Sequence, residues 1–283
     1  MPCYLPVLIG VLSPTLRAGW EPDTPVDDSL LRRFLVNWTA SIEAYGTPLG
    51  GRVLRRDDLV AIDLGRPSFG GNVTTLIAPL FPEGVDEVVA ALDDFYEFAK
   101  GDASGTVYMF SPWPTPDLRP NGWTLLGYQP LMLRLAGGVS PPAPAGLRIE
   151  EVQDEESLRA FEIAMVRGFE SSELEAQGSG AMFSTGMLAD DRYRLWVGWQ
   201  EDRPVSAAAT FVAAGINDVT LVGTVPEARR RGYGAALTWR ATLADPKLPA
   251  LLLATDEGRS VYEQIGYMSL FRFPVWSRAR PGA

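Results

Sequence analysis

The 283-residue chain contains no histidine and only one cysteine, Cys3. Without an imidazole the chain cannot form a Ser-His or Cys-His nucleophile pair, and every zinc site that needs a histidine ligand is excluded. A single thiol cannot close an internal disulfide or hold an iron–sulfur cluster. These absences exclude most classes of hydrolase, predict no metal site and are typical of a protein from a reducing, cytoplasmic compartment.

Long apolar runs and a basic charge balance are missing too. The apolar stretch at residues 4–12 is shorter than the roughly 20 residues that cross a bilayer, and it lacks the basic start of a secretory signal. Lys plus Arg number 25 against 35 Asp plus Glu, which gives a formal net charge of −10. Such a surface repels nucleic-acid phosphates and anionic lipids. We therefore expect no nucleic-acid or membrane partner, and a cationic or amine-bearing partner fits better.

The composition supports a globular protein of two parts. Hydrophobic residues make up 46% of the chain and charged residues 21%, so the chain can bury a substantial core. Gly and Pro are concentrated in residues 136–146, where they disfavour both helix and strand. We place a linker at residues 137–146, between an N-terminal domain of residues 1–136 and a C-terminal domain of residues 147–283.

Hydrophobic periodicity predicts that strands and helices alternate in both parts. In the first part we expect strands at 59–64, 73–78 and 106–110 and a helix at 85–98. In the second part we expect strands at 194–199, 205–212, 218–225 and 249–254 and helices at 157–169, 234–244 and 260–265. This order predicts an α/β fold in which helices flank a mixed sheet.

Two short segments indicate an internal repeat. Residues 125–134 and 264–272 each place a Gly-Tyr pair, Gly127-Tyr128 and Gly266-Tyr267, between an apolar run and a closing strand. The two pairs are separated by about half the chain, in agreement with the position of the linker. The sequence therefore predicts a duplication.

The segment with the clearest chemical pattern is 225–237, Val-Pro-Glu-Ala-Arg-Arg-Arg-Gly-Tyr-Gly-Ala-Ala-Leu. It joins a predicted strand to a predicted helix, so the amides around Gly232 and Gly234 lie at a helix start, where the dipole favours an anion. Glycine lets main chain approach a phosphate closely. The competing interpretation is a solvated basic cap on an ordinary helix. Three arginines at a helix N-terminus are electrostatically unfavourable, however, unless an anion is bound. The segment therefore predicts a pyrophosphate site.

Neither the P-loop motif, which needs Gly-Lys-Ser/Thr, nor the dinucleotide motif Gly-x-Gly-x-x-Gly matches this segment. Arg229-x-x-Gly232-x-Gly234 instead resembles the Gln/Arg-x-x-Gly-x-Gly/Ala motif of the GNAT superfamily of acyl-coenzyme A-dependent N-acyltransferases. The resemblance implies acetyl-coenzyme A as co-substrate, with its pyrophosphate on the loop amides and its pantetheine arm paired with the preceding strand. The cofactor-binding positions that it implies are Leu221, Gly223, Thr224, Val225, Arg229, Arg230, Arg231, Gly232, Tyr233, Gly234 and Ala235.

A second segment, residues 260–267, is similar to the superfamily's Leu-Tyr-x-x-x-Gly-Phe pattern. The resemblance puts Tyr262 on a short helix that faces the thioester, and a phenol with a pKa of about 10 is a suitable proton donor to a departing thiolate. We therefore assign Tyr262 as the general acid, although a tyrosine in such a position is elsewhere an ordinary core residue. Thr255 stands where many members carry Asn, which weakens the match at the pantetheine contact.

Acyl transfer to an amine also needs a base, and in a chain without histidine the base must be a carboxylate. Asp218 is our candidate, Glu170 and Glu173 are the alternatives, and a salt-bridged carboxylate is the competing interpretation for each. The resemblance implies direct attack by a primary amine of a small molecule or peptide in a ternary complex. Residues 171–187 are expected to form a mobile acceptor loop. Many relatives self-associate, so a homodimer is a possible state.

The resemblance further implies two GNAT-like domains in tandem, each with a mixed, mostly antiparallel sheet. The repeat aligns Trp123 with Tyr262 and Asp93 with Gly232, and neither first-half residue can perform the role of its counterpart. We expect the N-terminal domain to be a degenerate copy without a cofactor site. The function expected is N-acetyl transfer, and the alternative is a non-catalytic acyl-coenzyme A-binding regulatory or interaction protein.

Overall fold

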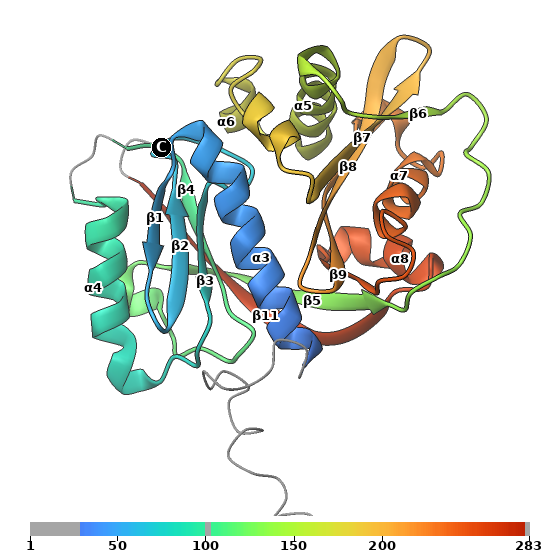
Figure 1. Ribbon diagram of the computed structural model, residues 1–283. Helices are drawn as coiled ribbons and strands as arrows, with labels where there is room; N and C mark the ends of the chain where they lie inside the picture. The colour runs from blue at the N-terminus through green and yellow to red at the C-terminus, as the bar shows by residue number, and fades with distance from the viewer. Residues whose placement is uncertain (1–28, 100–102, 281–283) are drawn as a thin grey trace, which may run out of the picture.

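The computed structural model describes residues 29–99 and 103–280 (Figure 1). Cys3 and the apolar stretch 4–12 lie outside these residues. Across the described ranges, none of the helices combines the length and apolar character that a bilayer crossing requires. The same ranges contain no group of three or more acidic, cysteine or histidine residues arranged to hold a metal ion.

One eleven-stranded sheet runs through the molecule in the order β1-β2-β3-β4-β11-β5-β10-β9-β8-β7-β6. The first half contributes β1 (Arg52–Arg55), β2 (Leu59–Asp63), β3 (Asn72–Leu76), β4 (Thr106–Phe110) and β5 (Thr124–Arg134). The second half contributes β6 (Arg148–Glu151), β7 (Tyr193–Gln200), β8 (Arg203–Ala213), β9 (Ile216–Thr224), β10 (Ala250–Leu253) and β11 (Met268–Ala279). Parallel and antiparallel pairs both occur, so the predicted mixed α/β fold is confirmed.

The two halves exchange their last strands. β5 pairs antiparallel with β10 of the second half, β11 pairs antiparallel with β4 of the first half, and β5 and β11 also pair with each other. The irregular segment between β5 and β6 lies where the sequence predicts the linker. The sheet is nevertheless continuous across that boundary, so the halves interlock rather than form two separate sheets (Figure 1).

Helices cover both faces of the sheet, because alternate residues of its central strands are apolar on each side. One face carries α3 (Leu30–Gly46), α5 (Glu155–Phe169) and α6 (Ser172–Glu175), and the other carries α4 (Val85–Tyr96), α7 (Tyr233–Thr242) and α8 (Asp256–Gln264). Along β8, Ala207 and Ala209 pack in the cluster of α5, whereas Ala208 packs in the cluster of α7. Short 3-10 turns lie at Thr47–Leu49, Pro82–Gly84, Arg119–Asn121, Thr185–Ala189 and Pro226–Ala228.

Helix α3, which the sequence analysis did not predict, joins the halves. It begins after Ser29, whose hydroxyl caps the helix, and it packs against β2 as well as β8 and β9 (Figure 1). The buried Asn37 donates from Nδ2 to the carbonyls of Phe211 and Ala213, both at 3.0 Å. A first-half helix therefore forms part of the wall over the second half.

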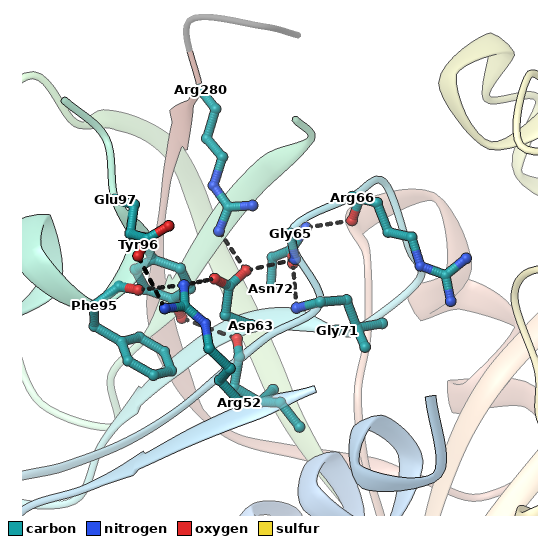
Figure 2. A network of polar contacts seen from close by, with 12 residues as sticks. Arg52, Asp63, Gly65, Arg66, Gly71, Asn72, Phe95, Tyr96, Glu97 and Arg280 are labelled. Carbon is teal, nitrogen blue, oxygen red and sulfur yellow. Dashed lines mark hydrogen bonds and ion pairs between the residues drawn. The ribbon is translucent and has the colours of Figure 1, made fainter. Parts of the chain in front are cut away.

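A buried ion pair fixes the end of β11 to the first half (Figure 2). The side chains of Asp63 on β2 and Arg280 after β11 are each 1% exposed and form a salt bridge. Asp63 also accepts from Arg52 Nη2 at 2.6 Å and from the Gly65 N–H at 2.8 Å. Because a buried charge without its partner is costly, this network stabilises the exchange of β11.

The repeat is visible in the structure, but its alignment at the helices differs from the sequence prediction. Gly232 is the N-cap of α7, and the N-cap of the corresponding helix α4 is Gly84. Asp93, which the sequence aligned with Gly232, lies inside α4 and forms a salt bridge with Arg278. The predicted pairing of Asp93 with Gly232 is therefore wrong.

The predicted alignment at the closing strands is shifted as well. Trp123 directly precedes β5 and Tyr267 directly precedes β11, so the strand starts align Trp123 with Tyr267 and not with Tyr262. Gly127 lies within β5, whereas Gly266 lies before β11. The two Gly-Tyr pairs thus occupy different positions in the fold. Aligning the two halves on these pairs therefore shifts the predicted repeat by several residues.

Candidate functional site

Strands β9 and β10, both entirely described, run parallel but pair only near their starts. Ala250 lies opposite Asn217 and Leu251 lies opposite Asp218, and no pair follows between these two strands. The remainder of β10 pairs with β5 on its other side. The edge of β9 beyond Asp218 is therefore open to pairing with an extended ligand.

A bulge lies in β9 next to this open edge. The pairing with β8 shifts between Ala207 and Ala209, and Leu221 has a φ of 51°, in the left-handed region that favours glycine. A non-glycine residue in this conformation is strained and is retained where the surrounding structure requires it, often at functional sites. Leu221 thus marks the point at which β9 departs from regular pairing.

Two of the predicted strand contacts direct their main chain toward β8 instead of toward the open edge. The Val225 N–H donates to the Val205 carbonyl at 2.9 Å, and the Gly223 carbonyl accepts from the Ser206 hydroxyl at 2.8 Å. The side chain of Val225 is fully buried. Any contact of Gly223 or Val225 with a cofactor stays a prediction, and these hydrogen bonds compete with it.

Thr224 has the opposite orientation. Its carbonyl accepts from Arg229 Nε at 3.0 Å, so its main chain faces away from β8. Because successive residues of a strand point to alternate edges, Val222 shares this orientation. Val222 is a candidate contact that our sequence analysis missed, since the motif gives spacing but not the direction of each main-chain group.

The loop at residues 229–235, which we call the Arg-Gly loop, carries main-chain donors without partners. The Arg229 N–H donates to the Pro226 carbonyl and the Ala236 N–H donates to the Gly232 carbonyl. Between them, the six N–H groups of residues 230–235 donate to no acceptor in the described ranges. Donors of this kind at a helix start, combined with the helix dipole, are the groups with which proteins bind anions, so the Arg-Gly loop is a candidate anion site.

Both glycines of the Arg-Gly loop suit its geometry, Gly232 through its left-handed backbone and Gly234 through its close approach to β9. Gly232 has a φ of 78°, and a Cβ placed there would lie 3.4 Å from Cγ of Pro144 in the linker. A Cβ at Gly234 would lie 3.1 Å from Oγ1 of Thr224. Tyr233, between them, has a buried side chain and can offer a ligand only its main chain. Ala235, in the first turn of α7, offers its N–H in the same way.

The three arginines of the loop have different environments. Arg229 donates from Nη2 to the Gly168 carbonyl at 2.8 Å and forms an ion pair with Glu170 at 2.6 Å, so it holds the loop against α5. Arg231 donates to Gln200 at 3.3 Å. Arg230 is exposed, and its side chain has no hydrogen bond or ion pair within the residues that the structure describes. Arg230 is therefore the arginine most available to an anionic ligand.

Tyr262 lies on α8, which contacts α7 and β5. Its side chain packs against the apolar cluster that Val222 and Ala235 also flank, and its ring lies 6.0 Å from that of Tyr267. The Tyr262 hydroxyl has no hydrogen bond to any described residue, whereas that of Tyr267 bonds Thr242 at 2.7 Å. Burial raises the pKa of Tyr262 to about 12, so it keeps its proton at neutral pH. The hydroxyl is therefore a proton donor without a protein partner.

Asp218 is fully buried and forms, with Leu251, the last pair between β9 and β10. Neither of its carboxyl oxygens has a hydrogen-bond partner in the described part of the chain. Burial raises the pKa of Asp218 well above its ordinary value, which favours the neutral acid in the folded protein. Its role as general base stays a prediction, and the carboxyl group must ionise before it can act.

The two alternative carboxylates are placed differently. Glu170 is held in the ion pair with Arg229. Glu173 on α6 is partly buried, and its Oε1 has no partner among the described residues. In the expected acceptor loop of residues 171–187, the N–H groups of Met182 and Phe183 donate to the buried Glu162 of α5, at 3.0 and 3.2 Å. This loop is therefore tied to α5 at its middle.

Comparison with known proteins identifies the fold through structural similarity, because the sequence comparisons find no match. The sequence matches no family model and no curated protein. The structure is similar to a GCN5-related N-acetyltransferase from Kribbella flavida, at 21% identity and a TM-score of 0.58, over 87% of this chain and 96% of that one. It is also similar to a GCN5-related N-acetyltransferase from Sphaerobacter thermophilus, at 14% identity and a TM-score of 0.53, over 80% of this chain and 82% of that one.

Both similarities extend over four fifths or more of each chain, so they include both halves of the molecule. The chain therefore has the fold of the GNAT acetyltransferases, and the resemblance stated from its sequence is confirmed at the level of the fold. The similarity in fold does not carry the residues of the site, which rest on the geometry described above.

Proposed function

We propose that the protein is an acyltransferase that moves an acetyl group from acetyl-coenzyme A to a primary amine. The observation that carries the proposal is the run of six unpartnered N–H groups at the start of α7, beside the open edge of β9. A doubly charged pyrophosphate linked to an extended, amide-bearing arm is complementary to both features. The net charge of −10 supports a cationic amine as the acceptor.

In this proposal the Arg-Gly loop binds the pyrophosphate through the N–H groups of residues 230–235, and Arg230 adds a positive charge that does not depend on pH. The main chain of Val222 holds the arm along β9, beside Thr224, whose carbonyl already accepts from Arg229 Nε. Acetyl-coenzyme A, as a diffusible co-substrate, supplies the acyl group as a thioester. The first half packs against β8 and β9 through α3, and against the end of α5 through Phe69 of the connection between β2 and β3.

In this proposal the side chains transfer two protons, one to the leaving thiolate and one from the attacking amine. As the amine nitrogen bonds to the acyl carbon and the carbon–sulfur bond breaks, the amine loses a proton and the thiolate gains one. Tyr262 donates to the thiolate, and a carboxylate, with Asp218 as the candidate, accepts from the amine. The phenol suits this role because its hydroxyl has no protein partner to release and is protonated at neutral pH. A main-chain N–H of β9 stabilises the developing oxyanion.

The test is acetyl-coenzyme A turnover against a library of primary amines, with release of free thiol as the readout. We expect thiol release that depends on the amine and an acetylated amine by mass spectrometry. Coenzyme A binding by calorimetry without turnover of any amine would favour the alternative, a regulatory protein that binds acyl-coenzyme A. Absence of binding would contradict both.

A further inference from the structure

Three buried oxygen atoms where the two halves meet have no hydrogen-bond partner among the described residues. They are Oδ1 of Asn37, on α3 of the first half, and both carboxyl oxygens of Asp218, on β9 of the second half. Both residues are fully buried. Because a buried polar atom without a partner is costly, we expect a hydrogen-bond donor to satisfy these oxygens in the folded protein.

The strand register brings the two side chains to the same place. Nδ2 of Asn37 donates at 3.0 Å to the carbonyl of Phe211, which lies directly opposite Asp218 in the pairing of β8 with β9. Residues in such a pair direct their side chains to the same face of the sheet. Phe211 packs in the cluster that contains Tyr45 of α3. Ile216, two residues before Asp218, also packs against α3. The Asp218 carboxyl group therefore points to the face that α3 covers, next to the Asn37 amide.

Tyr193 of β7 gives an independent sign of this placement. Its hydroxyl donates at 2.5 Å to the carbonyl of Ser41, one turn after Asn37 in α3. The pKa of Tyr193 is raised, first by burial and then by the charge of Asp218. The carboxyl group therefore lies within electrostatic reach of the same part of α3.

Among the described residues no cation offsets the burial of Asp218, because burial raises its pKa and no charged group lowers it. On α3, Arg33 lies over Gly215 in the turn between β8 and β9. On α5, the buried Glu162 is held by main-chain N–H groups of the expected acceptor loop. On β10, a leucine stands opposite Asp218, and the charge of Asp218 also reaches Tyr267, whose hydroxyl bonds a threonine of α7. None of these groups supplies a donor to the carboxyl oxygens.

The amide of Asn37 has a fixed orientation. Its nitrogen donates to the carbonyls of Phe211 and Ala213, both at 3.0 Å, and only the NH2 end of an amide can do so. Oδ1 is therefore the end that needs a donor. An ionised carboxylate has no hydrogen to offer, whereas a neutral carboxylic acid offers one O–H. Because burial favours the neutral form of Asp218, its own proton is the donor that suits Oδ1.

We propose that Asn37 is a positioning residue for Asp218, with Oδ1 of the amide accepting a hydrogen bond from the carboxylic acid. The bond joins the two halves, and it exists only while Asp218 is protonated. Its part in catalysis rests on the proposed function. When Asp218 takes a proton from the amine, an O–H bond forms as the N–H bond breaks, and Asn37 accepts from the acid that results.

The first test is a carbon-13 NMR titration of the Asp218 carboxyl, whose signal is assigned by its absence from Asp218→Asn. Asn37→Leu keeps the volume of the side chain and removes the acceptor. The neutral acid then loses its bond, so the pKa of Asp218 should fall by about half to one pH unit. Tyr45→Phe is the matched control, because it removes a different bond from α3 to the second half, at the Met182 carbonyl, and it should leave the titration unchanged. An unchanged or raised pKa in Asn37→Leu would overturn the inference.

A double-mutant cycle, measured by thermal unfolding at pH 5, tests the same bond without a titration. Asn37→Leu should lower Tm equally in the wild type and in Asp218→Asn, because the asparagine amide also offers a hydrogen to Oδ1. In Asp218→Leu, which offers none, the same change should lower Tm by about 2–4 °C less. An equal loss in all three backgrounds would show that the two side chains do not interact, and would overturn the inference.

A high-resolution crystal structure of the wild type tests the contact without any variant. Two acceptor oxygens repel each other unless a proton lies between them. A shared proton should therefore bring Oδ1 of Asn37 and one carboxyl oxygen of Asp218 to about 2.5–2.8 Å. A water molecule between the two oxygens, or a separation beyond hydrogen-bond distance, would contradict the direct bond.

The pH dependence of kcat separates this inference from the proposed function. If both hold, the acid limb of the kcat profile should move to lower pH in Asn37→Leu by the same amount as the pKa of Asp218. A lowered pKa without turnover of any amine would support the Asn37–Asp218 bond and overturn the proposed acyl transfer. A lowered pKa with an unmoved kcat profile would keep the bond and remove its part in catalysis. Turnover with an unchanged pKa of Asp218 would overturn the bond and leave acyl transfer standing.

Discussion

The two halves of the molecule place different chemistry at the same point of the same fold. In the second half, β9 pairs with β10 at two residues and then separates from it, and α7 begins after Gly232 with arginines before its first turn. In the first half, β3 and β4 stay paired over three residues, and the first turn of α4 contains Asp86 and Glu87. These acidic side chains interact favourably with the positive end of the α4 dipole, and they repel phosphate. The start of α4 therefore does not favour a bound anion.

In place of an anion site, the first half contributes residues that stabilise the fold. Asp63 and Arg280 form a fully buried pair across the two halves, and β5 and α3 reach over the second half. The open edge of β9 and the strained Leu221 have no stabilising role of this kind. A shared backbone arrangement thus fixes where a site can lie, and unpaired main-chain groups and local charge decide whether one is present.

The largest effect should follow from breaking the buried pair. Asp63→Ala leaves the buried Arg280 without its carboxylate, while Arg52 keeps its ion pair with Glu97, and we expect the free energy of unfolding to fall by about 3–5 kcal/mol. Denaturant unfolding measures this loss. Asp117→Ala, which removes an exposed ion pair with Arg119, is the control and should change nothing measurable. Similar stabilities for the two variants would show that the Asp63 network does not hold the halves together.

The next effect concerns the chemistry of the second half. Tyr262→Phe should lower kcat by about ten- to a thousandfold while coenzyme A affinity changes little, because only a proton donor is removed. Its stability should match that of the wild type, since the hydroxyl bonds no described residue. Tyr267→Phe, which loses the bond to Thr242, is the control and should destabilise the fold by about 1 kcal/mol. Full activity of Tyr262→Phe would remove it as the acid.

A third effect depends on pH. The folded protein keeps the proton on Asp218 to a higher pH than the unfolded chain does, so this group lowers stability progressively as pH rises above its ordinary pKa of 3.8. Asp218→Asn should therefore be more stable than the wild type at neutral pH, and the difference should shrink toward pH 4. Thermal unfolding from pH 4 to 8 checks this, and a constant difference would contradict the burial of a neutral acid.

The activity of Asp218→Asn provides a separate measurement. If Asp218 is the base, kcat should fall at every pH even though the protein is more stable. Unchanged turnover in this variant would assign the base to another carboxylate.

The smallest effect concerns the charge of the Arg-Gly loop. Arg230→Ala should weaken coenzyme A binding by about three- to tenfold, and the loss should diminish at high salt, because Arg230 contributes an exposed charge. Calorimetry at two ionic strengths measures it. Arg159→Ala, an exposed arginine of α5 paired with Glu155, is the control and should leave the affinity unchanged.

Local patterns predicted the elements that lie in each half. The alternation in Thr106–Phe110 gave β4 with its observed bounds, and the apolar spacing after Val85 gave α4 to within two residues. The Arg-Gly loop was also predicted correctly as a strand-to-helix connection, because its glycines and the flanking apolar runs are local signals. These features depend on neighbouring residues only.

Features that depend on distant residues were not predictable in this way. The exchange of β5 and β11 follows from which strand edges meet in the folded chain, and no periodicity encodes it. The orientation of Val222 depends on the pairing of β9 with β8. Glu170 and Glu173 are three residues apart and alike in sequence, and only the position of Arg229 shows that Glu170 is paired.

A calorimetric titration of coenzyme A into the wild type and three variants tests directly whether the cofactor site lies in the second half. The wild type should bind one molecule per chain. Gly232→Glu, which brings bulk and negative charge against the pyrophosphate, should bind none, and Gly84→Glu, at the equivalent N-cap of α4, should bind as the wild type does. Gly50→Glu repeats the left-handed strain at a position with no atom within 4 Å and should also bind normally. Retained binding in Gly232→Glu, or two molecules bound to each wild-type chain, would contradict the assignment of the site to the second half alone.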